Sequence, residues 1–222
     1  MKKDILKRIF VVGALVAAAL AAGILEYNYI PAVRWLAPLV VLGMTAELFI
    51  GVRRRIARET SKVKINQLWT NYTAAIVPFV VFLLFAAYFV GTRPWIMLLL
   101  FLIISAADTG AWFFGKWLGT TKLWEKISPN KTWSGQIAGI ICGTAAAILY
   151  GIVGGGTFLP QLMWIGTSVA LLSQYGDLTA SWLKRKLGLD DFGNMLPGHG
   201  GLMDRFDGWI YVLPIVWLAL GN

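Results

Sequence analysis

Long apolar runs separated by short polar segments follow one another along the whole chain. Taking a run of about 20 apolar residues as a helix that can cross a bilayer, the pattern predicts about seven membrane spans. These cover roughly residues 9–25, 35–52, 69–90, 95–118, 136–153, 158–183 and 206–220. The first run follows a basic start and is as long as a span needs, so we interpret it as a retained helix rather than a cleaved signal peptide. We therefore expect an all-α, polytopic transmembrane protein.

The number of spans stays open at one point of this pattern. Polar residues occur late in the run 158–183, among them Gln174, Asp177 and Thr179. The pattern therefore leaves open whether this helix leaves the bilayer before its last residue.

Composition supports a single membrane domain. Of the 222 residues, 58% are hydrophobic and the mean hydropathy is +0.67, which is more apolar surface than a soluble core of this size buries. The polar spacers reach only about 15 to 20 residues, too few for a second, soluble domain. We expect one domain over residues 1–222, with N-terminal spans in 1–94 and catalytic spans and cytoplasmic loops in 95–222.

The basic residues gather in alternate connecting segments. The net charge is +9, and with a cytoplasmic N-terminus all but Arg34 and Arg93 of the 20 Lys and Arg residues fall on the cytoplasmic side. This asymmetry predicts an N-in orientation and explains the charge with no nucleic acid as a partner. The expected partner is the lipid bilayer, and the default location is the plasma (inner) membrane, multi-pass, with a cytoplasmic active site.

Three acidic residues lie inside the apolar runs, where a charge costs roughly 2.5 to 3.5 kcal/mol to insert. They are Glu47, Asp108 and Asp177. For Glu47, an interhelical hydrogen bond and a functional role are both open. Asp108 is different, because it precedes a segment rich in hydrogen-bond donors.

The polar segment after Asp108 combines small residues with hydrogen-bond donors. Small residues let the backbone approach a ligand, while Lys, Ser, Asn and Thr side chains offer donors to phosphate oxygens. The donors are Ser128, Asn130, Lys131 and Thr132. We interpret the segment as a phosphate clamp; the alternative is an ordinary positive-inside loop with a Ser-Pro turn.

The densest polar cluster runs from residue 173 to residue 208. On a helix, Asp177, Ser181 and Lys184 are spaced i, i+4 and i+7 and share one face. Carboxylates and hydroxyls suit Mg²⁺, which usually takes one or two carboxylates together with water and substrate phosphates. We predict bound Mg²⁺ with Asp177, Asp204 and Asp207 as ligands, and helix capping is the alternative role for Asp207.

The single histidine, His199, lies between glycines in a Pro-Gly-His-Gly-Gly turn at 197–201. We do not expect a zinc site, because no cysteine or second histidine lies nearby. We expect phosphate contact or proton transfer from His199, with a plain loop histidine as the alternative.

Two stretches of the chain contain longer motifs. SWLKR at 181–185, followed by LPGHGGLMDRFD at 196–207, resembles the C-terminal signature of the phosphatidate cytidylyltransferases, also called CDP-diacylglycerol synthases. Upstream, DTGA at 108–111 and ISPNKTW at 127–133 resemble its nucleotide-side segment. The resemblance covers roughly residues 100–210. One departure is Asp190, at a position where the family commonly has lysine.

The resemblance implies an enzyme that joins CTP and phosphatidate to give CDP-diacylglycerol and pyrophosphate, with Mg²⁺ as cofactor. It implies that Asp177 and Asp204 bind the metal, with Asp207 either a metal partner or a residue that supports the metal ligands. Asp108 would coordinate the metal or organise the donor-rich loop. The implied phosphate-holding residues are Lys184, Arg185, His199 and Arg205, with Ser181 orienting one of them. The CTP triphosphate would contact Ser128, Asn130, Lys131 and Thr132. A homodimer is compatible with the family.

Two alternative functions belong beside this one. Another CTP-dependent lipid enzyme, such as a polyprenol kinase or an archaeal-lipid cytidylyltransferase, would use similar residues, and a kinase would release CDP. An ion-coupled transporter would line its path with Glu47, Asp108 and Asp177. The acids lie near predicted cytoplasmic ends beside basic loops, and no inverted halves are visible, which disfavours the transporter.

Overall fold

The computed structural model describes the C-terminal part of the chain almost continuously and the N-terminal part in short pieces. The described residues are 46–47, 49–53, 56–57, 64–68, 70–71, 86, 89, 93–154, 159–192, 201 and 203–220. The expected span 9–25 and most of the spans 35–52 and 69–90 lie outside the described residues, as does His199.

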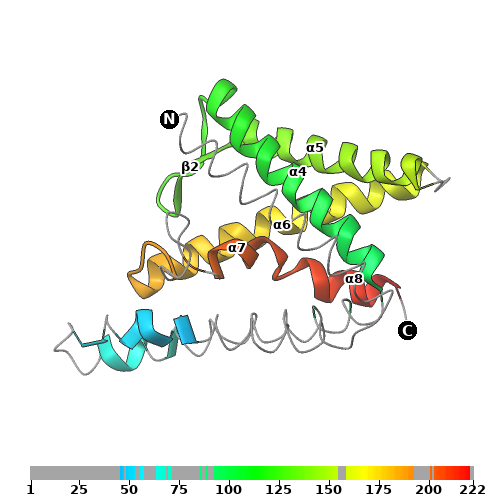
Figure 1. The fold of residues 1–222 in the computed structure, drawn as a ribbon. Helices are drawn as coiled ribbons and strands as arrows, with labels where there is room; N and C mark the ends of the chain where they lie inside the picture. Colours follow the sequence, from blue (N-terminus) through cyan, green and yellow to red (C-terminus); the bar gives the residue numbers. More distant parts are fainter. Residues whose placement is uncertain are drawn as a thin grey trace, which may run out of the picture.

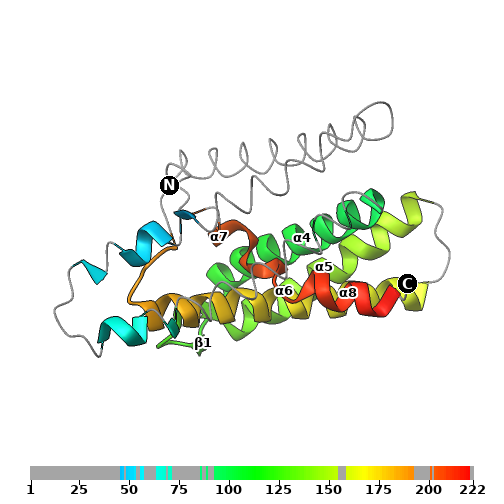
Figure 2. The same ribbon diagram turned by 90° about the horizontal axis from the view of Figure 1, so that it is seen from below.

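Three long helices form the body of the described structure. They are α4 (Pro94–Leu118), α5 (Trp133–Val153) and α6 (Leu159–Leu187), which pack side by side in both views (Figures 1 and 2). Helices α4 and α5 agree with the predicted spans 95–118 and 136–153, and both are long and apolar enough to cross a membrane. The mainly helical architecture is therefore confirmed, whereas seven spans and the N-in orientation stay predictions.

Helix α5 packs closely against its neighbours because small residues recur at every fourth position. The buried positions are Gly135, Gly139, Gly143, Ala147 and Gly151. A Cβ atom added at Gly139 would lie 2.8 Å from the backbone oxygen of Ala107 on α4, and one at Gly143 would lie 2.8 Å from the Cβ of Ala170 on α6. Stripes of small residues of this kind bring helix backbones together in membranes.

The predicted cytoplasmic loop contains a short antiparallel hairpin, which corrects the all-α expectation. Strand β1 (Lys122–Trp124) pairs with β2 (Ser128–Thr132), and Figure 1 shows β2 at the end of the bundle where α5 begins. Thr132 then caps α5, since its Oγ1 accepts a hydrogen bond from the Gly135 amide at 3.2 Å. Cross-strand pairing forms the hairpin, and a search for apolar runs does not register strands this short.

The predicted span 206–220 is also corrected, because the chain bends inside it. It forms α7 (Met203–Phe206), the 3₁₀ turn η1 (Asp207–Trp209) and α8 (Val212–Leu220). A Cβ atom added at Gly176 would lie only 2.5 Å from the backbone oxygen of Asp207, so η1 lies directly over a glycine of α6. The 9 residues of α8 extend about 14 Å, about half of a hydrocarbon core.

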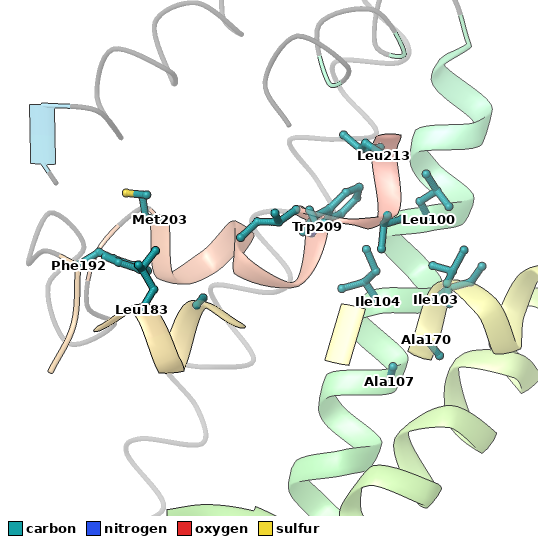
Figure 3. Close-up of a cluster of buried hydrophobic side chains, with 14 of the residues drawn as sticks. Leu100, Ile103, Ile104, Ala107, Ala170, Leu183, Phe192, Met203, Trp209 and Leu213 are labelled. Atoms are coloured by element: carbon teal, nitrogen blue, oxygen red, sulfur yellow. The ribbon is translucent and has the colours of Figure 1, made fainter. Parts of the chain in front are cut away.

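The buried apolar core follows the line where α6 meets α4 and the C-terminal elements. Figure 3 shows Leu100, Ile103 and Ile104 of α4 near Trp209 and Leu213, while Leu183, Phe192 and Met203 gather further along the cluster. Phe192 is 0% and Met203 1% exposed. This second group underlies the polar residues that end α6 and begin α7, and so fixes their relative positions.

Candidate active site

Helix α6 places the predicted polar residues along one face. The Ser181 hydroxyl donates a long hydrogen bond of 3.5 Å to Oδ1 of Asp177, and Ser181 and Lys184 are both buried. The helix ends at Leu187, Gly188 follows with a left-handed φ of 67°, and the Leu189 amide donates to the Lys184 carbonyl at 2.9 Å. The spacing argument for this face is thus confirmed for Asp177 and Ser181.

Lys184, Asp204 and Asp207 form a buried cluster that we name the closed site. The Lys184 Nζ atom lies 2.7 Å from Oδ1 of Asp204 and 4.0 Å from Oδ2 of Asp207. Burial on its own would lower the pKa of Lys184, but the carboxylates of Asp207 and Asp204 outweigh it and hold that pKa above its ordinary value. Lys184 is therefore a cation at any physiological pH.

Asp204 also joins parts of the backbone that flank residues 193–200. Its Oδ2 accepts hydrogen bonds from the Phe192 amide at 3.0 Å and from the Gly201 amide at 2.9 Å. The Phe192 ring lies 5.3 Å from the Lys184 Nζ atom. The sequence analysis missed Phe192, because no motif or charge marks it and its contacts arise only when the chain folds back onto α6.

Lys131 and Asp177 form a second contact, which we name the open pair. The Lys131 Nζ atom lies 2.6 Å from Oδ2 of Asp177, and the side chains are 22% and 35% exposed. This pair joins the predicted phosphate clamp on β2 to the predicted metal ligand on α6. Because both groups reach the surface, the lysine is able to exchange its carboxylate partner for a phosphate.

Asp108 of α4 belongs to the same charged cluster. It interacts electrostatically with Asp177 and Arg205, and Asp207 in turn interacts with Asp108 and Asp204. Four carboxylates from α4, α6, α7 and η1 therefore share one electrostatic environment, where like charges repel. Such a cluster favours positive charge, which Lys131 and Lys184 supply through their direct contacts.

The donor set is compatible with Mg²⁺. Across the described ranges, no three acidic, histidine or cysteine side chains come close enough together to enclose an ion. Mg²⁺ does not require this, since one or two carboxylates with water and substrate phosphates suffice. The ammonium groups of Lys131 and Lys184 lie beside Asp177 and Asp207, so these carboxylates already attract positive charge. The predicted ligation by Asp177, Asp204 and Asp207 stays a prediction.

Comparison with known proteins places this geometry in a family. The model described as "Cytidylyltransferase family" matches residues 2–221. The chain belongs to this family. The phosphatidate cytidylyltransferase of Staphylococcus saprophyticus is 42% identical over 125 residues, covering 56% of this chain and 48% of that protein. The one of Staphylococcus aureus strain COL is 44% identical over 122 residues, covering 54% and 46%.

The phosphatidate cytidylyltransferase of Bacillus subtilis strain 168 is similar as well. It is 42% identical over 122 residues, which cover 53% of this chain and 44% of that protein. The chain thus spans about half the length of the curated relatives it matches. The resemblance drawn from the two motif stretches is confirmed at the level of the family.

Asp190, the departure from the family pattern noted in the sequence, forms an ion pair with Arg185. The Arg185 Nη1 atom lies 2.8 Å from Oδ1 of Asp190, whose side chain is 99% exposed, and 3.4 Å from the Leu189 carbonyl. The Asp190 carboxylate therefore occupies the guanidinium group with which Arg185 is predicted to bind a phosphate.

The remaining predicted binding residues lie on or near the hairpin and α7. Ser128 is half-buried and Asn130 is exposed on β2, whereas Thr132 is buried as the cap of α5. Arg205 is exposed on α7. Of these β2 residues Asn130 is the exposed donor, Lys131 is partly exposed and paired with Asp177, and Thr132 fixes the start of α5.

Gln174 ties α6 to α5 one turn before Asp177. It is 4% exposed, and its Nε2 donates to the Gln136 carbonyl at 3.2 Å. The sequence analysis noted Gln174 only as a polar residue near the end of a span, and a buried amide that bridges two helices has no sequence signature. Glu47 is buried in the described N-terminal piece, and its role stays open.

Proposed function

We propose that this chain transfers the cytidylyl group of CTP to phosphatidate, giving CDP-diacylglycerol and pyrophosphate. The observation that carries the proposal is the open pair, in which a lysine of the clamp lies 2.6 Å from a carboxylate of the acidic cluster. A cation that could bind phosphate thus lies beside carboxylates that could bind a divalent metal, which supports the proposal. The names of the relatives at 42% and 44% identity support these substrates.

The reaction calls for alignment and charge neutralisation. An oxygen of the phosphatidate phosphate attacks the α-phosphorus of CTP, and the bond from that phosphorus to the bridging oxygen breaks. Pyrophosphate then leaves with the bonding electron pair. No protein nucleophile is required, so the side chains act by holding phosphates in line and countering their charge.

In this proposal the open pair separates when CTP binds. Lys131 moves its ammonium group from Asp177 to the triphosphate, and Ser128 and Asn130 of the same strand add donors. Asp177, oriented by Ser181, is then available together with Asp207 to hold Mg²⁺. When bound, Mg²⁺ would neutralise the charge on the phosphates and on the departing pyrophosphate.

The Lys184–Asp204 contact of the closed site keeps its geometry during this exchange. Lys184 is held by Asp204 and Asp207 and contributes a fixed positive charge near the reacting phosphates. Arg205 and Arg185, both exposed, would contact the lipid phosphate, with His199 as a further phosphate contact or proton carrier. Asp108, which interacts electrostatically with Asp177 and Arg205, would either coordinate the metal or organise the hairpin segment.

We further propose that the site faces the cytoplasm from the inner membrane, in a multi-pass, N-in arrangement with about seven spans. Two candidate spans flank the hairpin, so a site at this end of the bundle lies at the headgroup level, where a lipid phosphate and soluble CTP can meet. A homodimer stays a proposal from the family resemblance.

The experiment is CTP consumption by the purified protein with Mg²⁺, with and without phosphatidate. Pyrophosphate and lipid product are scored together, and Asp177→Asn serves as the inactive control. Lipid-dependent pyrophosphate with CDP-diacylglycerol is the expected result. Release of CDP would replace the proposal with a lipid kinase. No use of CTP with any lipid phosphate, combined with ion flux in proteoliposomes, would replace it with the transporter.

A further inference from the structure

Two lysine–tryptophan contacts occur in the last turns of helices at the hairpin end of the bundle. On α4, the Lys116 Nζ atom lies 5.5 Å from the centre of the Trp112 ring. On α6, the Lys186 Nζ atom lies 3.9 Å from the centre of the Trp182 ring. Figure 1 shows both helix ends on the side of the bundle where β2 lies. We name these four residues the aromatic–basic collar.

The rings of the collar are accessible from outside the bundle. Trp112 is 45% and Trp182 42% exposed, and Lys116 and Lys186 are exposed as well. Further exposed tryptophans surround the same end of the bundle, namely Trp117, Trp124 and Trp133. Exposed tryptophans in this number are typical of the depth at which lipid headgroups meet acyl chains.

A cation beside an exposed ring is suited to a lipid phosphate. The ring occupies the boundary between headgroups and chains, and the cation–π contact holds the ammonium group at the same depth. Each lysine near an anionic leaflet adds attraction to its lipids. A basic residue in the last turn is also favoured by the helix dipole, but the dipole does not require the lysine to lie over an exposed ring.

We propose that the aromatic–basic collar binds the phosphate groups of anionic phospholipids in the surrounding leaflet, as a lipid contact separate from the reaction site. The collar residues belong neither to the open pair nor to the closed site, and their cations contact rings rather than the acidic cluster. The inference rests on the membrane location proposed above but not on the reaction. Bound lipid would anchor the hairpin end of the bundle at the headgroup layer.

The test measures lipid retention, so it does not depend on turnover. The full chain is purified from nanodiscs that contain phosphatidylcholine and phosphatidylglycerol, and native mass spectrometry counts the phospholipids that remain bound. The double variant Lys116→Gln/Lys186→Gln should lose the preference for phosphatidylglycerol by about tenfold. Trp112→Leu/Trp182→Leu, which keeps the cations and apolar bulk, should show a smaller loss. Circular dichroism and elution volume verify folding.

The matched control is Lys126→Gln, because Lys126 is exposed in the hairpin turn and no ring contact defines it as part of the collar. Lys126→Gln removes only the general attraction of one lysine, so lipid retention should fall far less than in the double variant. An equal loss for Lys126→Gln would overturn the proposal in favour of general net charge. Unchanged retention in the double variant would overturn it directly.

Three other outcomes would assign the collar to a different ligand and so defeat the proposal. Displacement of phosphatidylglycerol by soluble glycerol phosphate would indicate a site for free anions. A dimer that dissociates in the double variant, with lipid retention intact, would indicate a second copy as the partner. A raised KM for phosphatidate with intact phosphatidylglycerol retention would indicate a substrate subsite. Absence of any CTP turnover would refute the proposed function and leave this proposal standing.

Discussion

The closed site and the open pair contain the same chemical contact in two environments. Lys184 lies 2.7 Å from Asp204, with side chains 11% and 6% exposed. Lys131 lies 2.6 Å from Asp177, with side chains 22% and 35% exposed. The distances are nearly equal, so the difference between the two contacts lies in their access to solvent.

This difference predicts different roles for the two lysines. Removing one partner of a buried ion pair leaves an uncompensated charge and costs roughly 3 to 5 kcal/mol, whereas an exposed pair contributes about 0 to 1 kcal/mol. Lys184 therefore fixes the C-terminal segment against α6. Lys131 can release Asp177 at little cost, which a residue that binds and releases a nucleotide needs.

The largest effect should come from Lys184→Gln. The substitution leaves Asp204 and Asp207 buried without their cation, so the free energy of unfolding should fall by about 3 kcal/mol and CTP turnover should reach background. Denaturant unfolding in detergent and pyrophosphate release measure the two quantities. Lys126→Gln, in the exposed hairpin turn, should change neither. If Lys184→Gln had the same free energy of unfolding as the wild type, the closed site and the open pair would not differ in their contribution to stability.

The pH dependence of this effect follows from the pKa of Lys184. Because that pKa is raised in the folded protein, the stabilisation from the closed site is fully present below the ordinary lysine pKa of 10.5. It is lost only as the pH rises through the higher folded value. The difference in unfolding free energy between wild type and Lys184→Gln should therefore stay constant from pH 7 to about pH 9.

The second effect is expected for Asp177→Asn, which should separate activity from stability. Turnover should fall by about 10² to 10³, because a charged group that orients metal and phosphates is lost. The free energy of unfolding should change by less than about 1 kcal/mol, since the pair is partly exposed. Glu125→Gln, an exposed acid of the hairpin turn, is the control and should keep both. If Asp177→Asn lost about 3 kcal/mol of unfolding free energy along with its activity, as expected for Lys184→Gln, Asp177 would belong with the closed site.

A smaller effect on turnover is expected for Gly176→Ala, which alters the packing between the two sites. The added Cβ atom would lie 2.5 Å from the Asp207 carbonyl, so η1 must shift and the free energy of unfolding should fall by about 1 to 3 kcal/mol. Turnover should fall as Asp207 moves relative to Asp177. Gly154→Ala is the control, because its new Cβ atom would meet only the Tyr150 carbonyl at 3.2 Å, away from the site, and its turnover should be that of the wild type. Equal turnover in the two variants would show that η1 tolerates the shift.

The smallest effect concerns Asp190→Lys. The substitution frees Arg185 and adds a cation, so the KM for phosphatidate should fall by about threefold while stability changes by less than about 1 kcal/mol. Asp190→Asn frees Arg185 without adding the charge and should give part of the decrease. A KM that rises in both variants would show that Arg185 binds no lipid phosphate.

Local patterns in the sequence predicted the parts of the molecule that depend on neighbouring residues. Apolar length predicted α4 and α5, and helical spacing predicted that Asp177 and Ser181 share a face. The hairpin was missed because its strands are stabilised by each other rather than by a pattern of their own. The bend at η1 was missed because it depends on the contact of Asp207 with Gly176, a residue distant in the sequence.

The candidate site shows the same limit at the level of side chains. The motif resemblance brought Lys131, Lys184 and Asp204 into one proposed site, but not the choice of partner for each. That Lys131 contacts Asp177 while Lys184 contacts Asp204 follows from how β2 and α7 pack on α6. Phe192 depends wholly on such packing, since its amide and ring meet the closed site only in the folded chain.

The most direct measurement is the affinity of the purified protein for CTP with and without Mg²⁺, in wild type and in Asp177→Asn. Without Mg²⁺, the account predicts tighter binding by Asp177→Asn, because the variant frees Lys131 and removes a repelling carboxylate. With Mg²⁺, the order should reverse, because wild type gains a metal ligand that the variant lacks. If the same protein, wild type or Asp177→Asn, bound CTP more tightly both with and without Mg²⁺, the result would contradict the claim that the open pair separates to admit the nucleotide and the metal.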